Sequence, residues 1–162
     1  MTRRLITSSL FSINKNFSIP TLIINRAVSS TIGLNDLKIL GFGAGNKPVP
    51  EARKSLAEKG YNNIKIFGIY NTKESDQELI AALKEKQWDV VAIGSYVNGF
   101  DQAAHYQEKG VSTDRTEILL WFNRVLNLVH ELAPKSKIVL LKSPHDLFDG
   151  IQRILGVEQK QT

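Results

Sequence analysis

Short apolar runs alternate along the chain with stretches in which apolar residues recur every three or four positions. The runs predict buried strands, because a strand covered on both faces carries apolar side chains at successive positions. The three-and-four spacing predicts amphipathic helices that each turn one face toward a sheet. Strands are expected at about 37–40, 64–69, 89–93 and 138–141, and helices at about 48–59, 75–86, 114–133 and 143–155.

This alternation is typical of α/β domains, in which right-handed crossovers place helices on both faces of a parallel sheet. We predict a three-layer α/β sandwich of the Rossmann or flavodoxin-like kind, with a four-stranded parallel sheet in the order 2-1-3-4. That order places the strands at 37–40 and 89–93 in the centre, so that their glycine-bearing carboxyl ends meet where ligands bind in such sheets. The domain is predicted to cover residues 34–157, with a tail at 158–162.

Individual residues mark several helix boundaries. Ser75 followed by Glu78 is a capping-box pattern, which predicts a helix start at that point. Asp114 followed by Glu117 has the same form before the third long helix. Gly156 is predicted to end the last helix, because glycine readily adopts the left-handed conformation of a helix C-terminus.

A long connection, residues 94–114, follows the third strand and far exceeds the usual length of loops in α/β units. It predicts a lid or a binding loop, with a short helix possible at 101–109. Aromatic and amide groups at a strand end can hold a planar ligand, or they can pack the loop on the core. The predicted ligand contacts in this connection are Gly94, Ser95, Tyr96 and Asn98, with Phe100 on the same surface.

The first strand runs into Gly41, Gly43 and Gly45, which are followed by Asn46. Such a glycine turn could bring backbone amides close to a phosphate, since glycine has no Cβ and the helix that follows adds its positive dipole end. The pattern departs from the dinucleotide fingerprint, which requires a third glycine at the position that Asn46 occupies. It also departs from the Walker pattern, because proline follows Lys47. These four residues are predicted to bind the ligand; the alternative is a turn that only requires glycine torsions.

Residues 142–146 begin the last predicted helix. Ser143 is expected to cap it and, together with Lys142, to contact an anionic part of the ligand. His145, in the same segment, and His105, in the long connection, are the two candidates for a general base. Whether the protein is an enzyme stays open, as does any cofactor. Two histidines without a placed carboxylate make a poor metal site, so no metal is predicted.

Composition excludes several classes of site. The chain has no cysteine, which rules out disulfides, thiolate catalysis and cysteine-based zinc sites. The formal charge of +5 comes mainly from the four basic residues that precede Asp36, the first acidic residue. The rest of the chain is nearly neutral, so a basic surface for nucleic acid is not expected. No apolar stretch is long enough to predict membrane insertion.

Residues 1–33 carry arginine, serine and threonine but no acidic residue, and their apolar residues have spacings that a helix could gather on one face. This composition is typical of a mitochondrial presequence. The stretch from Arg26 to Ser30 also has the form of a matrix-protease cleavage pattern. We therefore predict location in the mitochondrial matrix; the alternatives are a disordered tail and an additional strand at 21–24.

The predicted helix at 114–133 has more apolar residues than one sheet-facing stripe requires. The stripe expected to face the sheet consists of Ile118, Phe122, Val125, Val129 and Leu132. Leu120, Trp121 and Leu128 then point away from it, and an exposed apolar patch of this kind is typical of a partner-binding surface. The helix thus predicts a homodimer, unless the connection at 96–111 or the N-terminal segment covers the patch.

Two segments resemble receiver domains of response regulators. WDVVAIGSYVNGFDQ, from Trp88, is similar to their third strand and the loop after it, and LKSPHDLFDGIQRIL, from Leu141, is similar to their last turn and helix. The acidic residues of receivers are missing, since Gly94 takes the position of the phosphoacceptor and Gly41 and Phe42 take those of the paired acids. The resemblance implies a shared architecture without phosphotransfer.

Residues 37–156 also resemble a group of small flavodoxin- or receiver-like α/β proteins of bacteria and fungi that has no assigned activity. The resemblance lies in Trp88-Asp89 with Ile93-Gly94, in the run FNRVLNLVH that begins at Phe122, and in Ser143-Pro144 with Asp146. It implies the fold and supplies no mechanism.

Taken together, these patterns predict a small mitochondrial α/β protein that binds a small ligand, which could bear a phosphate, at the carboxyl ends of the strands. The predicted site consists of 41–46, 94–100 and 142–146. The alternative is a non-catalytic interaction module with a degenerate receiver-like architecture.

Overall fold

Four parallel strands form the sheet of the domain, in the predicted order β2-β1-β3-β4. The computed structural model describes residues 36–98 and 108–156, all of which belong to one compact unit of the chain, 31–162. The predicted presequence, His105 and Phe100 lie outside the described residues. No described helix is long and apolar enough to cross a membrane.

Strands and helices alternate along the chain, as the apolar pattern predicts. The strands are β1 (Ile39–Ala44), β2 (Ile64–Ile69), β3 (Val90–Ile93) and β4 (Lys137–Leu140). The helices are α1 (Val49–Glu58), α2 (Lys73–Glu85), α3 (Arg115–Leu132) and α4 (Leu147–Leu155), with the 3₁₀ turn η3 (Pro144–Asp146) directly before α4.

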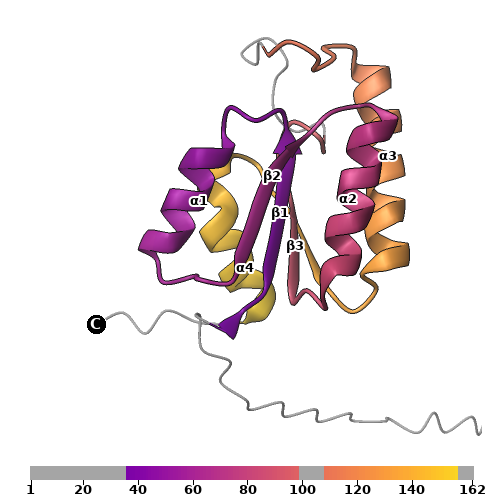
Figure 1. Cartoon of the computed structure of the whole chain (residues 1–162). Helices are drawn as coiled ribbons and strands as arrows, with labels where there is room; N and C mark the ends of the chain where they lie inside the picture. The colour runs from indigo at the N-terminus through magenta and orange to yellow at the C-terminus, as the bar shows by residue number, and fades with distance from the viewer. Residues whose placement is uncertain (1–35, 99–107, 157–162) are drawn as a thin grey trace, which may run out of the picture. The chain divides into compact units, whose positions relative to one another are not determined.

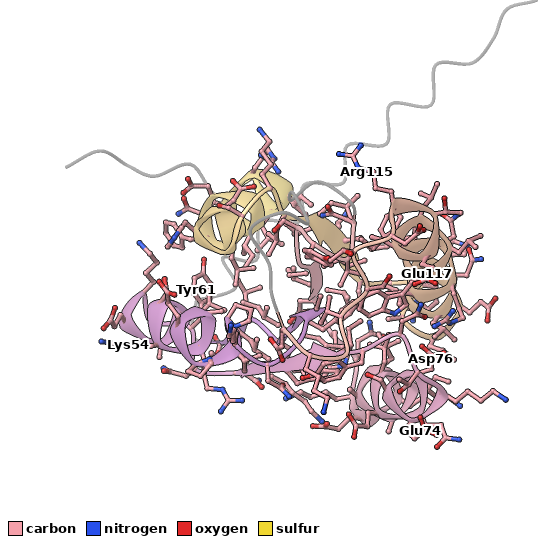
Figure 2. The ribbon with its side chains drawn as sticks, turned by 90° about the horizontal axis from the view of Figure 1, so that it is seen from above. Lys54, Tyr61, Glu74, Asp76, Arg115 and Glu117 are labelled. Carbon is pink, nitrogen blue, oxygen red and sulfur yellow. The ribbon has the colours of Figure 1, made fainter. Side chains whose placement is uncertain are left out.

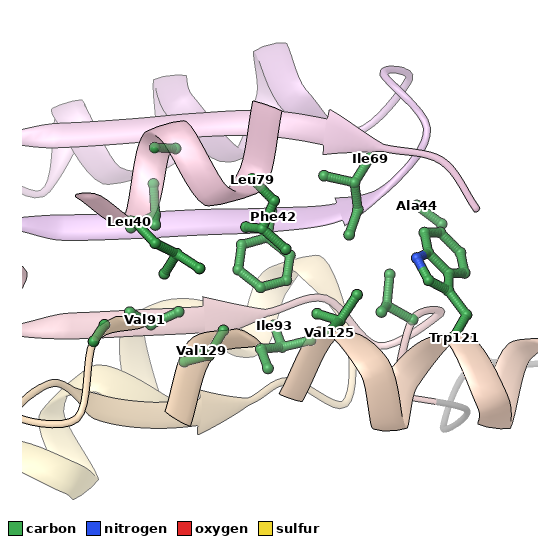
Figure 3. Packing of buried hydrophobic residues seen from close by; sticks show 14 of the residues in the cluster. Leu40, Phe42, Ala44, Ile69, Leu79, Val91, Ile93, Trp121, Val125 and Val129 are labelled. Atoms are coloured by element: carbon green, nitrogen blue, oxygen red, sulfur yellow. The ribbon is translucent and has the colours of Figure 1, made fainter. Parts of the chain in front are cut away.

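The sheet separates two apolar cores, because successive side chains of a strand point to opposite faces. α2 and α3 cover one face, and α1 and α4 cover the other (Figure 1). Phe42 of β1 and Ile93 of β3 face α2 and α3, where they pack with residues such as Val125 (Figure 3). Ile39 and Val90, at alternate positions of the same strands, pack on the side of α1 and α4.

β1 continues through two of the glycines that the sequence analysis assigned to a turn. Gly41 and Gly43 lie inside the strand, where Gly41 pairs with Ala92 of β3 and Gly43 with Gly68 of β2. β1 lies between β2 and β3, so hydrogen bonds on both sides hold its backbone extended even at glycine. Only Gly45, whose φ is 68°, forms the turn. The prediction of one glycine turn from 41 to 46 was therefore wrong for its first residues.

Helix capping agrees with the sequence at some ends and differs at others. Asp114 caps α3 as predicted, and its Oδ1 accepts the Glu117 N–H at 2.9 Å. α2 starts earlier than predicted, since Thr72 caps it and the Ser75 hydroxyl accepts the Tyr70 N–H at 2.9 Å instead. Ser143 precedes η3 but makes no side-chain cap hydrogen bond. Gly156 ends α4 in the left-handed conformation, with φ 66°.

The buried face of α3 differs from the predicted one. Trp121 is buried and Leu128 is partly buried, whereas Leu119 and Leu120 are 58% and 63% exposed. Trp121 belongs to the core that α3 shares with α2 and the sheet. A helix that packs against a sheet and a second helix buries a wider face than one sheet-facing stripe. Trp121 therefore leaves the predicted exposed patch.

Candidate functional site

An apolar pocket with a volume of about 130 Å³ lies between α1 and α4 at the carboxyl ends of the central strands. α1 and α4 stand on one side of the sheet and α2 and α3 on the other (Figure 2). The pocket is lined by Gly41, Phe42, Gly43, Ala44, Pro48, Val49, Ala52, Ile66, Phe67, Ala92, Gly94, Ser95, Tyr96, Leu141 and Leu147.

Small residues on one face of the two central strands form the floor of this pocket. Gly41 and Gly43 alternate with Phe42, so both face α1 and α4, as do Ala92 of β3 and Gly94, which directly follows β3. A Cβ added at Gly43 would meet only the Gly94 Cα, at 3.7 Å. Because these positions carry at most a methyl group, they leave space between the helices, beside the Ile66 side chain of β2, which lies over Gly41.

The walls of the pocket are also apolar. Ala52 faces the pocket from α1, and Leu147 lines it from the start of α4. Toward the other end of the sheet the space between the helices is closed, because the Tyr61 ring packs edge-on against Phe148 with centroids 6.0 Å apart. Ser95 contributes a buried polar side chain to the lining. The pocket thus suits a small apolar group.

The backbone amides expected to hold a phosphate hold a carboxylate of the protein instead. Glu108 accepts the Asn46 N–H at 2.9 Å and the Lys47 N–H at 3.3 Å. It also accepts the Tyr70 hydroxyl at 2.7 Å. A Cβ at Gly45 would overlap with this carboxylate, which is a second reason, beside its positive φ, for glycine at that position.

Hydrogen bonds around Glu108 fix the turn between β1 and α1. The Asn46 Oδ1 accepts the Gly68 N–H of β2 at 3.2 Å. The hydrogen bond that the Tyr70 hydroxyl donates to Glu108 raises the pKa of Tyr70, because it favours the protonated phenol. Asn46 therefore has a structural role in this turn, and its backbone N–H donates to Glu108 of the same chain.

Tyr96 and Asn98, which were predicted to contact a ligand, also hold the connection after β3 in place. The buried Tyr96 donates its hydroxyl hydrogen to the Ser112 carbonyl at 2.7 Å. Asn98 donates from Nδ2 to the Leu141 carbonyl at 2.8 Å, so it joins the ends of β3 and β4. These contacts match the alternative in which the loop packs on the core, although Tyr96 still lines the pocket.

The segment after β4 lies beside the pocket, and the side chains of its two candidate functional residues are exposed. Leu141 and Leu147 line the pocket, and Lys142 and Ser143 directly follow Leu141. The Lys142 and His145 side chains are exposed. Among the described residues, no group of three histidine or acidic side chains could hold a metal ion.

The structure therefore brings Gly41, Gly43, Gly94, Ser95 and Tyr96 together around one pocket. It uses Gly45 and Asn46 for the adjoining turn. Sequence reasoning missed Ala52, Ala92 and Leu147, which complete the lining, and Glu108, which occupies the amides. The small residues at alternate positions of both central strands were a usable signal for the floor. Glu108 had none, since it lies 62 residues from Asn46.

No protein-family model matches the chain, and comparison with curated proteins finds no significant match. The inference of function rests on the geometry of the pocket.

Proposed function

We propose that the protein binds a small, largely apolar ligand in the pocket between α1 and α4. The observation that carries this proposal is an apolar cavity of about 130 Å³ at the carboxyl ends of β1 and β3. Ligands of open α/β sheets bind at this edge, where neighbouring strands diverge to different helices.

Pocket size limits the ligand. An apolar cavity of about 150 Å³ in another protein accommodates benzene. The pocket between α1 and α4 is of similar volume, so it suits one aromatic ring or a short branched chain. The backbone floor at Gly41, Gly43 and Gly94 presents few side-chain atoms, which favours a flat group that lies against the sheet. The proposal concerns binding and assigns no catalytic residue.

A pair of matched leucine substitutions on α1 tests the proposal. Ala52 lines the pocket, whereas Ala57 lies on the same helix with its side chain exposed. Ala52→Leu should fill the cavity and abolish binding of ring compounds, and Ala57→Leu should leave it intact. The measurement is a thermal-shift screen of small aromatic and branched aliphatic compounds, since a ligand of the native state raises its melting temperature.

Compounds that stabilise the parent and Ala57→Leu proteins but not Ala52→Leu would support the pocket. The proposal would be wrong if no compound stabilised the parent protein, or if every stabilising compound acted equally on Ala52→Leu.

A specific observation also favours self-association through α3. Leu119 and Leu120, adjacent residues of α3, are both exposed. Exposed apolar patches often mark a contact with another protein. We propose that α3 contributes to a homodimer, which would fit an interaction module. Trp121 takes no part in this surface, because it is buried.

A further inference from the structure

We infer that Glu108 makes the pocket selective for uncharged ligands. This inference rests on the proposed function and names the class of ligand that the same pocket takes. It departs from the sequence-based prediction, in which the ligand could bear a phosphate that meets the amides before α1.

The Glu108 carboxylate occupies the position that a phosphate of the ligand would need. It accepts the N–H groups of Asn46 and Lys47 and the hydroxyl of Tyr70. An anionic ligand group could reach these donors only by displacing Glu108. A displaced carboxylate would lose charge-assisted hydrogen bonds, which are among the stronger ones in proteins.

In the chain, the amides that hold the carboxylate lie between two residues of the pocket lining. They belong to residues 46 and 47, and Ala44 and Pro48 on either side line the pocket. A negative charge that extended from the pocket toward these amides would approach the Glu108 carboxylate. Repulsion between like charges grows as the effective dielectric constant falls, and an unpaired charge is costly to bury.

The positive charges described at this edge of the sheet lie outside the apolar lining. Lys47 and Lys142 are both exposed, and neither belongs to the lining. Among the described residues, the lining contains no lysine, arginine or histidine, so its walls offer no cation to pair with a buried anion. An uncharged ligand avoids both the repulsion and the loss of solvation.

Two probes that share a ring but differ in charge test the inference. Benzyl alcohol is uncharged and benzoate is an anion at neutral pH, so their dissociation constants can be compared in the parent protein, in Glu108→Gln and in Glu58→Gln. Glutamine keeps the size of the side chain and an oxygen acceptor but removes the charge. Glu58 is an exposed acid at the far end of α1, which makes Glu58→Gln the matched control.

We expect the parent and the Glu58→Gln control to bind benzyl alcohol at least tenfold more tightly than benzoate. In Glu108→Gln this ratio should fall at least fivefold, mainly because benzoate binds better. Urea unfolding of each variant shows whether it is folded. If Glu108→Gln does not fold, the inference is tested in the parent protein by measuring the ratio of the two dissociation constants at increasing salt concentration. Added salt should reduce the ratio if charge repulsion sets it.

Three outcomes would overturn the inference. Equal affinity of the parent for both probes would show that the pocket does not select against anions. The apolar lining alone would set the preference if folded Glu108→Gln kept the parent's ratio of dissociation constants for the two probes. The same would follow if added salt left that ratio unchanged in the parent. In each of these cases the ring still binds, and the proposed function stands. Failure of both probes to bind any variant would instead reject the pocket itself, and the inference with it.

Discussion

Alanine at Gly43 should stabilise the domain, although Gly43 lies in a motif that resembles a phosphate-binding loop. A Cβ added at this position would make only an ordinary van der Waals contact, since its nearest neighbour is the Gly94 Cα at 3.7 Å. The φ of Gly43 is not positive, so alanine fits the backbone. Replacing glycine by alanine at a compatible position stabilises by about 0.4–1 kcal/mol through the unfolded state. Burial of one methyl group in the pocket adds up to about 0.8 kcal/mol.

Alanine at Gly94, which lies directly beside Gly43, should have the opposite effect on stability. A Cβ there would lie 2.9 Å from the Gly43 Cα and 3.2 Å from the Phe42 carbonyl oxygen. Both neighbours are backbone atoms of the central strand β1, which cannot move without disturbing its hydrogen bonds. Overpacking of this kind costs roughly 1–3 kcal/mol.

Urea unfolding followed by circular dichroism measures both effects. The midpoint of Gly43→Ala should rise, with a stability gain of about 1 kcal/mol, and that of Gly94→Ala should fall. The slope of the transition should stay the same, because neither change alters the surface exposed on unfolding. A Gly43→Ala protein that is less stable than the parent would refute the assignment of Gly43 to the open floor of the pocket.

Three further predictions concern pH, import and assembly. The hydrogen bond to Glu108 raises the pKa of Tyr70 in the folded state. The stability that this bond contributes is therefore fully present below a pH of about 10, and it is lost as the pH rises through the raised pKa. The difference in urea midpoint between the parent and Tyr70→Phe should therefore shrink between pH 8 and pH 11; a constant difference would contradict this. We propose mitochondrial import from the composition of residues 1–33, so a fluorescent fusion that lacks them should be cytosolic, and continued import would disprove the presequence. Leu119→Glu with Leu120→Glu should dissociate the proposed homodimer without unfolding the domain, whereas a parent protein that sediments as a monomer at micromolar concentration would exclude the dimer.

The order and type of the elements could be predicted from the sequence, because the signals are local. The unbroken apolar run from Val90 to Ile93 marks a strand covered on both faces, and the spacing along α3 marks a helix. Crossover geometry then limits the possible sheets to a few, of which 2-1-3-4 is the one observed. The location of the pocket follows in part from the same reasoning, since parallel strands gather their carboxyl ends at one edge.

Packing between distant residues was beyond the reach of the sequence. Glycine at 41 and 43 has a local preference for turns, but β2 and β3 on both sides of β1 provide hydrogen bonds that outweigh this preference. Trp121 is buried because α2 packs beside α3, and periodicity along one helix does not report on its neighbours. Glu108 reaches the amides before α1 because folding places the described end of the long connection, from 108, at the carboxyl edge of the sheet. We propose that this carboxylate favours an uncharged ligand over the phosphate-bearing one that the sequence allowed, since the charge near a pocket depends on what folding brings beside it.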